Sequence, residues 1–283
     1  MNSPEKKAEH FIELVDLMAR LRSEDGCPWD RKQTHESLKR YLVEECAELL
    51  DSIDSGDQQA VCEELGDMFL QLVFHAQIAA EAGQFDVGDA LKSISSKLVF
   101  RHPHVFGDES AADAEEVLDI WQRQKEREAK GDEDGSALSR VPKSLPALAR
   151  AQEIQRKASK VGFDWQEVSG PLEKVKEEVG ELEETVTSDM NKDERENEIG
   201  DLLFAIVNVC RFSGIEAEDA MRRANRKFEQ RFKEVEERSR SQGRKLEEMS
   251  LEEMDALWDA VKEDEVPGKD IKPLQESRGR KED

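Results

Sequence analysis

The two halves of this 283-residue chain repeat each other, and this repeat constrains the fold more than any other feature. In the first half, YLVEECAELLDSI (41–53) precedes EELGDMFLQLVFHAQ (63–77). In the second half, KVKEEVGELEETV (174–186) precedes NEIGDLLFAIVNVCR (197–211). Because one pattern occurs twice in the same order, we expect two structural units of one kind in tandem.

The repeat extends into other segments. One pair keeps a lysine and an arginine four residues apart, another keeps a tryptophan, and a third matches only loosely. These pairs are KLVFR (97–101) with KFEQR (227–231), EEVLDIWQRQKE (115–126) with EEMDALWDAVKE (252–263), and GCPWD (26–30) with GFDW (162–165).

Apolar residues recur with the period of an α-helix along most of the chain. We find no alternating apolar and polar run bounded by turn residues, so we expect no sheet. The sequence therefore predicts an all-α protein made of two tandem helical-bundle repeats. The expected helices cover 8–21, 38–53, 60–82, 89–100, 114–129, 171–187, 194–212, 216–238 and 250–262.

The stretch KGDEDGSALSRVPKSLPA (130–147) collects Gly, Asp, Ser and Pro and predicts a linker. We therefore expect an N-terminal repeat over 1–129 and a C-terminal repeat over 148–265. The polar residues 266–283 predict a flexible tail.

The composition excludes several classes of function. A formal net charge of −24 argues against binding to nucleic acid or to a membrane surface, because both are anionic. No apolar run is long enough to span a membrane, and the first ten residues lack a signal-peptide core, so we expect a cytoplasmic protein. The cysteines show no CxxC spacing and are expected to be reduced, mostly buried thiols: Cys27, Cys46, Cys62 and Cys210.

Two acidic pairs in the second half are candidates for metal binding. Glu178 and Glu181 lie three residues apart on one expected helix, and Glu198 and Asp201 do the same on the next. If these helices pack antiparallel, four carboxylates converge and repel one another unless cations neutralise them. An all-oxygen site favours Mg²⁺, with Mn²⁺ as a substitute.

The first half can build the same quartet from Glu45, Glu48, Glu64 and Asp67, which gives a possible second metal site. Glutamates at this spacing usually form a solvated helix face instead. Here each ExxD pair lies inside an apolar run, and the whole arrangement occurs twice. Metal binding is therefore the favoured interpretation.

A basic segment suggests what the metal acts on. MRRANRKFEQRFK (221–233) contains six Lys or Arg residues and one Glu. Lys227 and Arg231 share a helix face and could hold a polyphosphate, while Trp258 could stack on a base. The alternatives are ordinary surface charge and a core tryptophan. Together with Mg²⁺, these residues suggest a nucleoside triphosphate as the substrate.

With these motifs in place, the chain resembles the two-repeat bacterial form of the MazG family of nucleoside triphosphate pyrophosphohydrolases over roughly residues 8–265. The signature is EExxE followed by ExxD, and FRHPHVF (100–106) and KSLPALARAQ (143–152) also match. The resemblance implies an all-α homodimer that uses Mg²⁺ to hydrolyse nucleoside triphosphates to monophosphate and pyrophosphate. It also implies either housecleaning of abnormal nucleotides or control of nucleotide-linked stress signals.

The resemblance places activity in the C-terminal repeat, with Glu178, Glu181, Glu198 and Asp201 as metal ligands and catalytic residues. The implied nucleotide-binding residues are Lys174, Glu177, Lys192, Arg195, Lys227, Arg231 and Trp258. Lys192 and Arg195 precede ExxD in a register that differs from the usual lysine of the family.

The distribution of cations independently favours the second repeat, because a triphosphate needs positive charge near the carboxylates. Lys174 precedes the second acidic motif, whereas Tyr41 stands at the same place in the first. The first repeat keeps the residues Lys97, Arg101 and Trp121, so activity there stays open.

Two other classes of function can be compared with these motifs. A di-iron bundle oxidase needs Glu-x-x-His pairs, but His75 lies eight residues beyond Asp67 and the second half contains no histidine. A non-catalytic helical protein, with its quartets as regulatory metal sites, remains as the alternative function.

Overall fold

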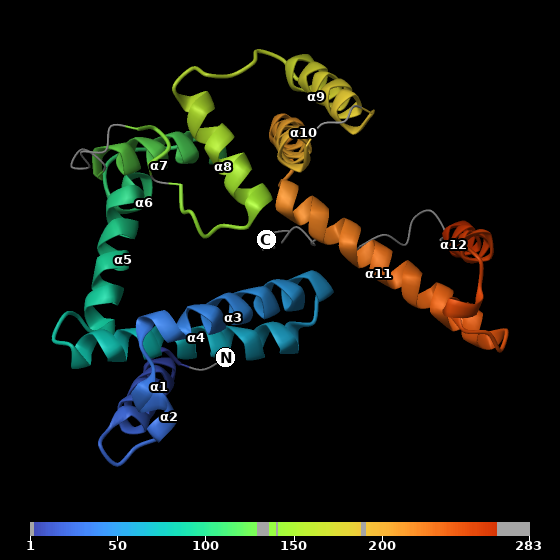
Figure 1. Cartoon of the computed structure of the whole chain (residues 1–283). Helices are drawn as coiled ribbons and strands as arrows, with labels where there is room; N and C mark the ends of the chain where they lie inside the picture. The colour runs from blue at the N-terminus through green and yellow to red at the C-terminus, as the bar shows by residue number, and fades with distance from the viewer. Residues whose placement is uncertain (1–2, 129–135, 140, 188–190, 265–283) are drawn as a thin grey trace, which may run out of the picture. The chain divides into compact units, whose positions relative to one another are not determined.

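The structure, a computed structural model, consists of helices and the turns that join them (Figure 1). No strand occurs in the part of the chain that it describes, so the all-α prediction is confirmed. The described residues are 3–128, 136–139, 141–187 and 191–264.

Contacts between residues divide the chain into two compact units, Met1–Asp132 and Glu133–Asp283. Each unit contains one copy of the repeated acidic motifs, as expected for tandem repeats. The predicted tail over 266–283 lies outside the described residues, as does part of the predicted linker.

In the first unit, α3 packs along α4, while α1 also packs on α4. Beyond them, α5 contacts α4, α6 and α7. The helices are α1 (Pro4–Arg22), α2 (Pro28–Lys32), α3 (His35–Ser55), α4 (Gln58–Glu81), α5 (Val87–Arg101), α6 (Pro103–Phe106) and α7 (Ala114–Glu128).

The turn between α3 and α4 explains how the first quartet is assembled. Gly56 ends α3 in the left-handed region with φ 74°, and the Asp57 side chain accepts hydrogen bonds from the first amides of α4. This short turn reverses the chain, so residues equally far from it lie opposite each other. Glu48 and Glu64 are each eight residues from Gly56 and therefore face one another.

In the second unit, α9 packs along α10 in the same way, and α8 packs on both α10 and α11. Figure 1 shows α11 continuing from the end of α10, with α12 beside it. The helices are α8 (Ala147–Lys160), α9 (Ser169–Thr187), α10 (Lys192–Phe212), α11 (Ala217–Ser241) and α12 (Leu251–Asp264), with a 3₁₀ turn at Leu246–Glu248.

The recurrence of apolar residues did not predict helix α8. Its buried positions include Gln152 and Gln155, whose side chains make hydrogen bonds to the backbone. Because a glutamine does not count as apolar, the buried face of α8 is invisible to a hydrophobic pattern. The short helices α2 and α6 were also not predicted.

The prediction that the cysteines are mostly buried is wrong. Cys46 and Cys62 are exposed, and Cys27 and Cys210 are half-buried. The helix faces that carry the two exposed cysteines are not covered within the first unit, which a sequence pattern cannot reveal.

Candidate active site

The second unit brings three of the four predicted carboxylates together. Glu178 on α9 and Glu198 and Asp201 on α10 each place an oxygen within 4.8 Å of the others. Glu178 is 4% exposed, although glutamates are seldom buried without a partner. Glu181 lies outside this group, but loss of surrounding solvent and the nearby charge of Glu178 raise its pKa.

A lysine from the same helix neutralises part of this charge. The Lys174 ammonium lies 2.8 Å from Glu177 Oε1 and 2.6 Å from Glu178 Oε1. These two carboxylates accept its hydrogen bonds and hold the pKa of Lys174 above its usual range. Lys174 therefore stays cationic at the edge of the carboxylate group.

The donor set fits a hard divalent cation. The second oxygen of Glu178, Oε2, is buried and has no hydrogen-bond partner in the described part of the chain. An unpaired, buried carboxylate oxygen is unfavourable unless a cation or a donor reaches it. Three carboxylates with no nitrogen or sulfur ligand match the preference of Mg²⁺ and Mn²⁺.

The first unit also brings three carboxylates together, but its group includes Glu48, the counterpart of Glu181, and not Asp67, the counterpart of Asp201. Glu45, Glu48 and Glu64 place oxygens within 4.8 Å of one another, and Glu64 Oε2 is buried with no hydrogen-bond partner among the described residues. Desolvation, followed by repulsion from neighbouring carboxylates including Asp67, raises the pKa of both Glu45 and Glu64. The first group of carboxylates thus carries negative charge that no counterpart of Lys174 offsets, since Tyr41 stands at that position.

A pocket of about 400 Å³ adjoins the second carboxylate group, and we call it the Trp165 pocket. It lies between α8, α9, α10 and the turn over 161–168. Lys174, Glu178 and Asp201 form part of its wall, and most of the remaining surface is apolar. Its other principal lining residues are Ile154, Gln155, Phe163, Trp165, Phe204 and Asn208.

The position of Trp165 depends on a close approach to α9. A Cβ atom at Gly170 would lie 2.1 Å from Trp165 Cδ1, so only glycine leaves room for the indole. The preceding residue, Asp164, forms two hydrogen bonds with the Arg211 guanidinium of α10, at 3.0 and 2.5 Å. Together these contacts fasten the 161–168 turn to the two helices that carry the carboxylates.

No sequence motif assigned a function to Trp165 or Asn208. The signal for Trp165 was the loose match between GFDW and GCPWD. The signal for Asn208 was a single polar residue inside the apolar run LLFAIVNV. Asn208 is 6% exposed, and its Oδ1 accepts a hydrogen bond from Arg211.

The predicted nucleotide-binding residues fall into separate groups. Lys174 and Glu177 lie at the carboxylates, and the exposed Lys192 and Arg195 occupy the start of α10.

Lys227, Arg231 and Trp258 belong to α11 and α12 and do not line the Trp165 pocket. The Trp258 ring lies 5.1 Å from that of Phe228 and 5.8 Å from the Arg231 guanidinium carbon. The first unit repeats this pair, since the guanidinium carbon of Arg101 lies 5.7 Å from the Trp121 ring.

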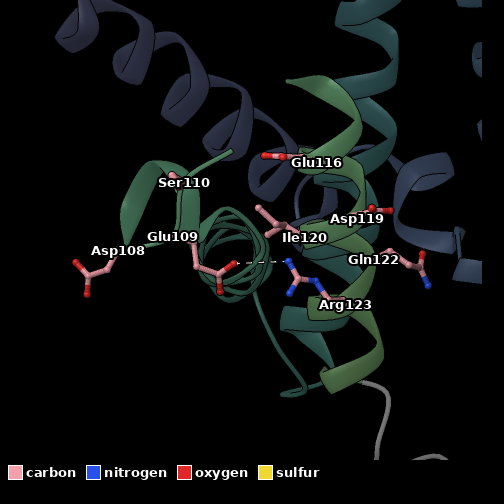
Figure 2. Close-up of a pocket in the computed structure, with 8 residues that line it drawn as sticks. All are labelled: Asp108, Glu109, Ser110, Glu116, Asp119, Ile120, Gln122 and Arg123. Carbon is pink, nitrogen blue, oxygen red and sulfur yellow. Dashed lines mark ion pairs between the residues drawn. The ribbon is translucent and has the colours of Figure 1, made fainter. Parts of the chain in front are cut away.

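A larger pocket, of about 750 Å³, lies in the first unit beside α7 (Figure 2). Figure 2 shows the Glu109 carboxylate directed toward Arg123, 3.9 Å away, while Asp108 points away from it. The pocket contains none of the predicted site residues, and its carboxylates do not converge as the quartets do. We therefore take the smaller Trp165 pocket as the candidate active site.

Comparison with known proteins agrees with this geometry. The model of the MazG nucleotide pyrophosphohydrolase domain matches residues 33–106 and 166–236, one copy in each unit.

The chain is 47% identical to the nucleoside triphosphate pyrophosphohydrolase/pyrophosphatase MazG of Thermotoga maritima, over 89% of this chain and 95% of that protein. It is 44% identical to the nucleoside triphosphate pyrophosphohydrolase of Escherichia coli, over 89% of this chain and 97% of that protein. Relatives so similar over nearly their whole length share one fold and one arrangement of repeats with this chain. The chain therefore belongs to the MazG family of nucleotide pyrophosphohydrolases.

Proposed function

We propose that this enzyme hydrolyses nucleoside triphosphates and their deoxy forms to the monophosphate and pyrophosphate with Mg²⁺. The observation that carries the proposal is the convergence of Glu178, Glu198 and Asp201 beside Lys174 on the wall of a pocket. The names of the relatives support a nucleoside triphosphate as the substrate. Removal of unwanted nucleotides from the cytoplasmic pool is the role we propose.

In this reaction, water forms a bond to the α-phosphorus and the bond from that phosphorus to the bridging oxygen breaks, which releases pyrophosphate. Mg²⁺, when bound, activates the water and neutralises charge on the phosphates. Glu178, Glu198 and Asp201 would hold it, with Glu181 as a nearby fourth carboxylate. Mn²⁺ suits the same oxygen ligands.

The cations of the chain would hold the triphosphate. Lys174 is already beside the carboxylates, so binding of substrate can draw it from Glu177 to a phosphate oxygen. Lys192 and Arg195 stand on the first turns of the helix that carries Glu198. We assign Lys227, Arg231 and Trp258 to the nucleotide as well.

We propose a homodimer because apolar side chains remain uncovered at matching positions of both repeats. Leu65, Phe69 and Leu72 on α4 are 44–54% exposed. Their counterparts on α10 are 43–48% exposed: Ile199, Leu203 and Ile206. Continuous apolar helix faces of this kind usually mark an interface. Sedimentation of the intact chain tests the proposal, and a monodisperse monomer at micromolar concentration would contradict it.

The test of the activity is pyrophosphate release from a panel of nucleoside triphosphates, with Mg²⁺ or with chelator. We expect release with Mg²⁺ that is lost in Glu198→Gln. Glu237→Gln, at an exposed position of α11, is the matched control and should retain activity. An equal loss of pyrophosphate release in Glu237→Gln would show that the site has been assigned wrongly. Metal binding without any pyrophosphate release would favour the alternative, a non-catalytic regulatory protein.

The sequence predicted that no segment is apolar and long enough to span a membrane, and the helices can be compared with this prediction. Within the described ranges, none of them combines the length and the apolar character that a membrane span requires.

A further inference from the structure

The first unit contains a contact between two histidines that has no counterpart in the second unit. His35 Nδ1 and His75 Nδ1 lie 2.7 Å apart, and the two ring planes differ by 3°. His35 is the first residue of α3 and His75 lies on α4, so the contact joins the two helices of the hairpin far from the Gly56 turn. When the acidic motifs are aligned, valines stand at both places in the second unit, Val168 and Val209.

The hydrogen bond between these nitrogens limits the number of protons that the pair can hold. One Nδ1 must donate and the other must accept, so protons on both nitrogens would break the contact. His75 Nε2 is buried and has no hydrogen-bond partner in the described part of the chain. Because a buried N–H without an acceptor is especially unfavourable, we assign the proton of His75 to Nδ1, which then donates to His35.

In this arrangement neither ring can gain a proton without a loss. A second proton on His75 would occupy the buried Nε2, while a second proton on His35 would lie on Nδ1 and face the N–H of His75. A cation at His35 is also unfavourable, because the amino end of α3 is the positive end of the helix dipole. Burial, followed by the charge of His35, lowers the pKa of His75. Folding of the first unit therefore favours the neutral pair.

The surroundings of the pair do not offset a positive charge. Among the described residues, His35 is the only one whose charge changes the pKa of His75. Charged groups on the helices that pack on α4, namely α1, α3 and α5, have contacts of their own. These contacts join Arg22 of α1 to Glu81 of α4, Glu36 to Lys39 on α3, and the Asp89 carboxylate to the Asp86 amide at the start of α5.

The pair borders the core of the first unit along both helices. One turn after His35, Leu38 is 1% exposed and belongs to this core. Val73 and Phe74, the two residues before His75, belong to the same core. Release of the first turns of α3 from α4 would therefore expose Leu38 to solvent.

We propose that the His35–His75 pair is a pH-sensitive contact, which holds the first turns of α3 on α4 at neutral pH and releases them in acid. The stabilising contribution of the neutral pair is complete above about pH 6.5, the ordinary pKa of histidine, and is lost as the pH falls through the lowered pKa of His75. The α9–α10 hairpin carries valines at these places and should not respond. Acid therefore loosens one repeat and not the other, irrespective of the proposed hydrolysis.

Amide hydrogen exchange of the full chain, measured from neutral to mildly acidic pH and corrected for the intrinsic pH dependence of exchange, tests the proposal. Protection of the α3 amides that follow His35 should fall up to about tenfold per pH unit for each proton taken up, whereas protection of α9 should not fall. Glu45 and Glu64 cannot cause the fall, since their raised pKa values stabilise the folded unit in acid.

A double variant and a matched control assign the effect to the pair. His35→Val together with His75→Val installs the residues of the second repeat and should abolish the fall in protection. His10→Gln, at an exposed histidine of α1, should keep it. A fall that is as large in the double variant as in the unmodified protein would overturn the proposal.

A titration of the unmodified protein, followed by nuclear magnetic resonance, covers the case in which the double variant does not fold. The imidazole nitrogens of His75 should show a proton on Nδ1 at neutral pH, and His75 should take up its second proton only below pH 6.5. A pKa of 6.5 or higher for His75 would overturn the proposal, because folding would then not oppose its charge.

Discussion

The two carboxylate groups share two equivalent members and differ in the third, Glu48 in the first unit and Asp201 in the second, and in what surrounds them. In each unit, three carboxylates from a helical hairpin place oxygens within 4.8 Å of one another. In the second unit Lys174 touches Glu178 and a pocket opens beside them. In the first, Tyr41 stands at the position of Lys174 and packs edge-on against Trp29, with ring centroids 5.9 Å apart.

This comparison shows that the residues needed to bind a metal are different from the residues needed to bind a substrate. A metal site needs only the repeated EExxE and ExxD motifs, which both halves keep. A nucleotide site also needs cations for the phosphates and space for the base. A few substitutions beside the carboxylates can therefore abolish substrate binding in one repeat, while its carboxylates stay intact.

The strongest test of the comparison is removal of one carboxylate from each unit. Glu178→Gln should abolish pyrophosphate release, because it removes the most buried of the proposed metal ligands of the second unit. Glu45→Gln should leave most of the activity. Substantial turnover in Glu178→Gln would make the first repeat a second enzyme, and the asymmetry would be wrong.

A test of stability follows from the packed core of the first unit. Phe74→Ala should lower the free energy of unfolding by about 3–5 kcal/mol, because Phe74 is 3% exposed in the core. Asn208→Ala, at the equivalent place, removes one hydrogen bond and should cost about 1 kcal/mol. Urea unfolding of the two variants measures both values. A larger loss in Asn208→Ala would show that the second unit is packed like the first.

The role of the cation can be tested by exchange between repeats. Lys174→Tyr gives the second repeat the residue of the first and should lower kcat/KM about tenfold to a hundredfold, since a charge-assisted hydrogen bond to phosphate is lost. In a protein that carries Glu178→Gln, the additional substitution Tyr41→Lys should add no activity. An unchanged kcat/KM in Lys174→Tyr would show that Lys174 does not contribute to the substrate site.

The smallest expected effect is on the pH dependence of stability without metal. Glu45 and Glu64 have a pKa raised above 4.5, so the folded state holds their protons more tightly than the unfolded state. Their contribution to stability is present below about pH 4.5 and is lost as the pH rises through the raised values.

Glu45→Gln with Glu64→Gln should therefore be slightly more stable than the unmodified protein at pH 7 in chelator. The difference should shrink as the pH falls toward 4.5 and should also shrink when Mg²⁺ is added. Thermal unfolding at several pH values measures it. A difference independent of pH would mean that the charges of these carboxylates do not oppose folding.

Much of the fold was predictable because the hairpins follow from local rules. Apolar periodicity predicted α3, α4, α9 and α10, and the repeated spacing predicted that their carboxylates meet. The Trp165 pocket was not predictable in this way. Its walls come from α8, the 161–168 turn and two further helices, and no local pattern shows that Gln155, Trp165 and Asn208 converge. Helix α8 itself was hidden because its buried positions carry glutamines.

The matching apolar faces of α4 and α10 have a consequence during synthesis. Residues of α4 such as Phe69 leave the ribosome roughly 130 residues before their counterparts on α10. At elongation rates of about 5–20 residues per second this interval is on the order of ten seconds. The nascent first unit therefore exposes the apolar face of α4 before the matching face of α10 has been synthesised.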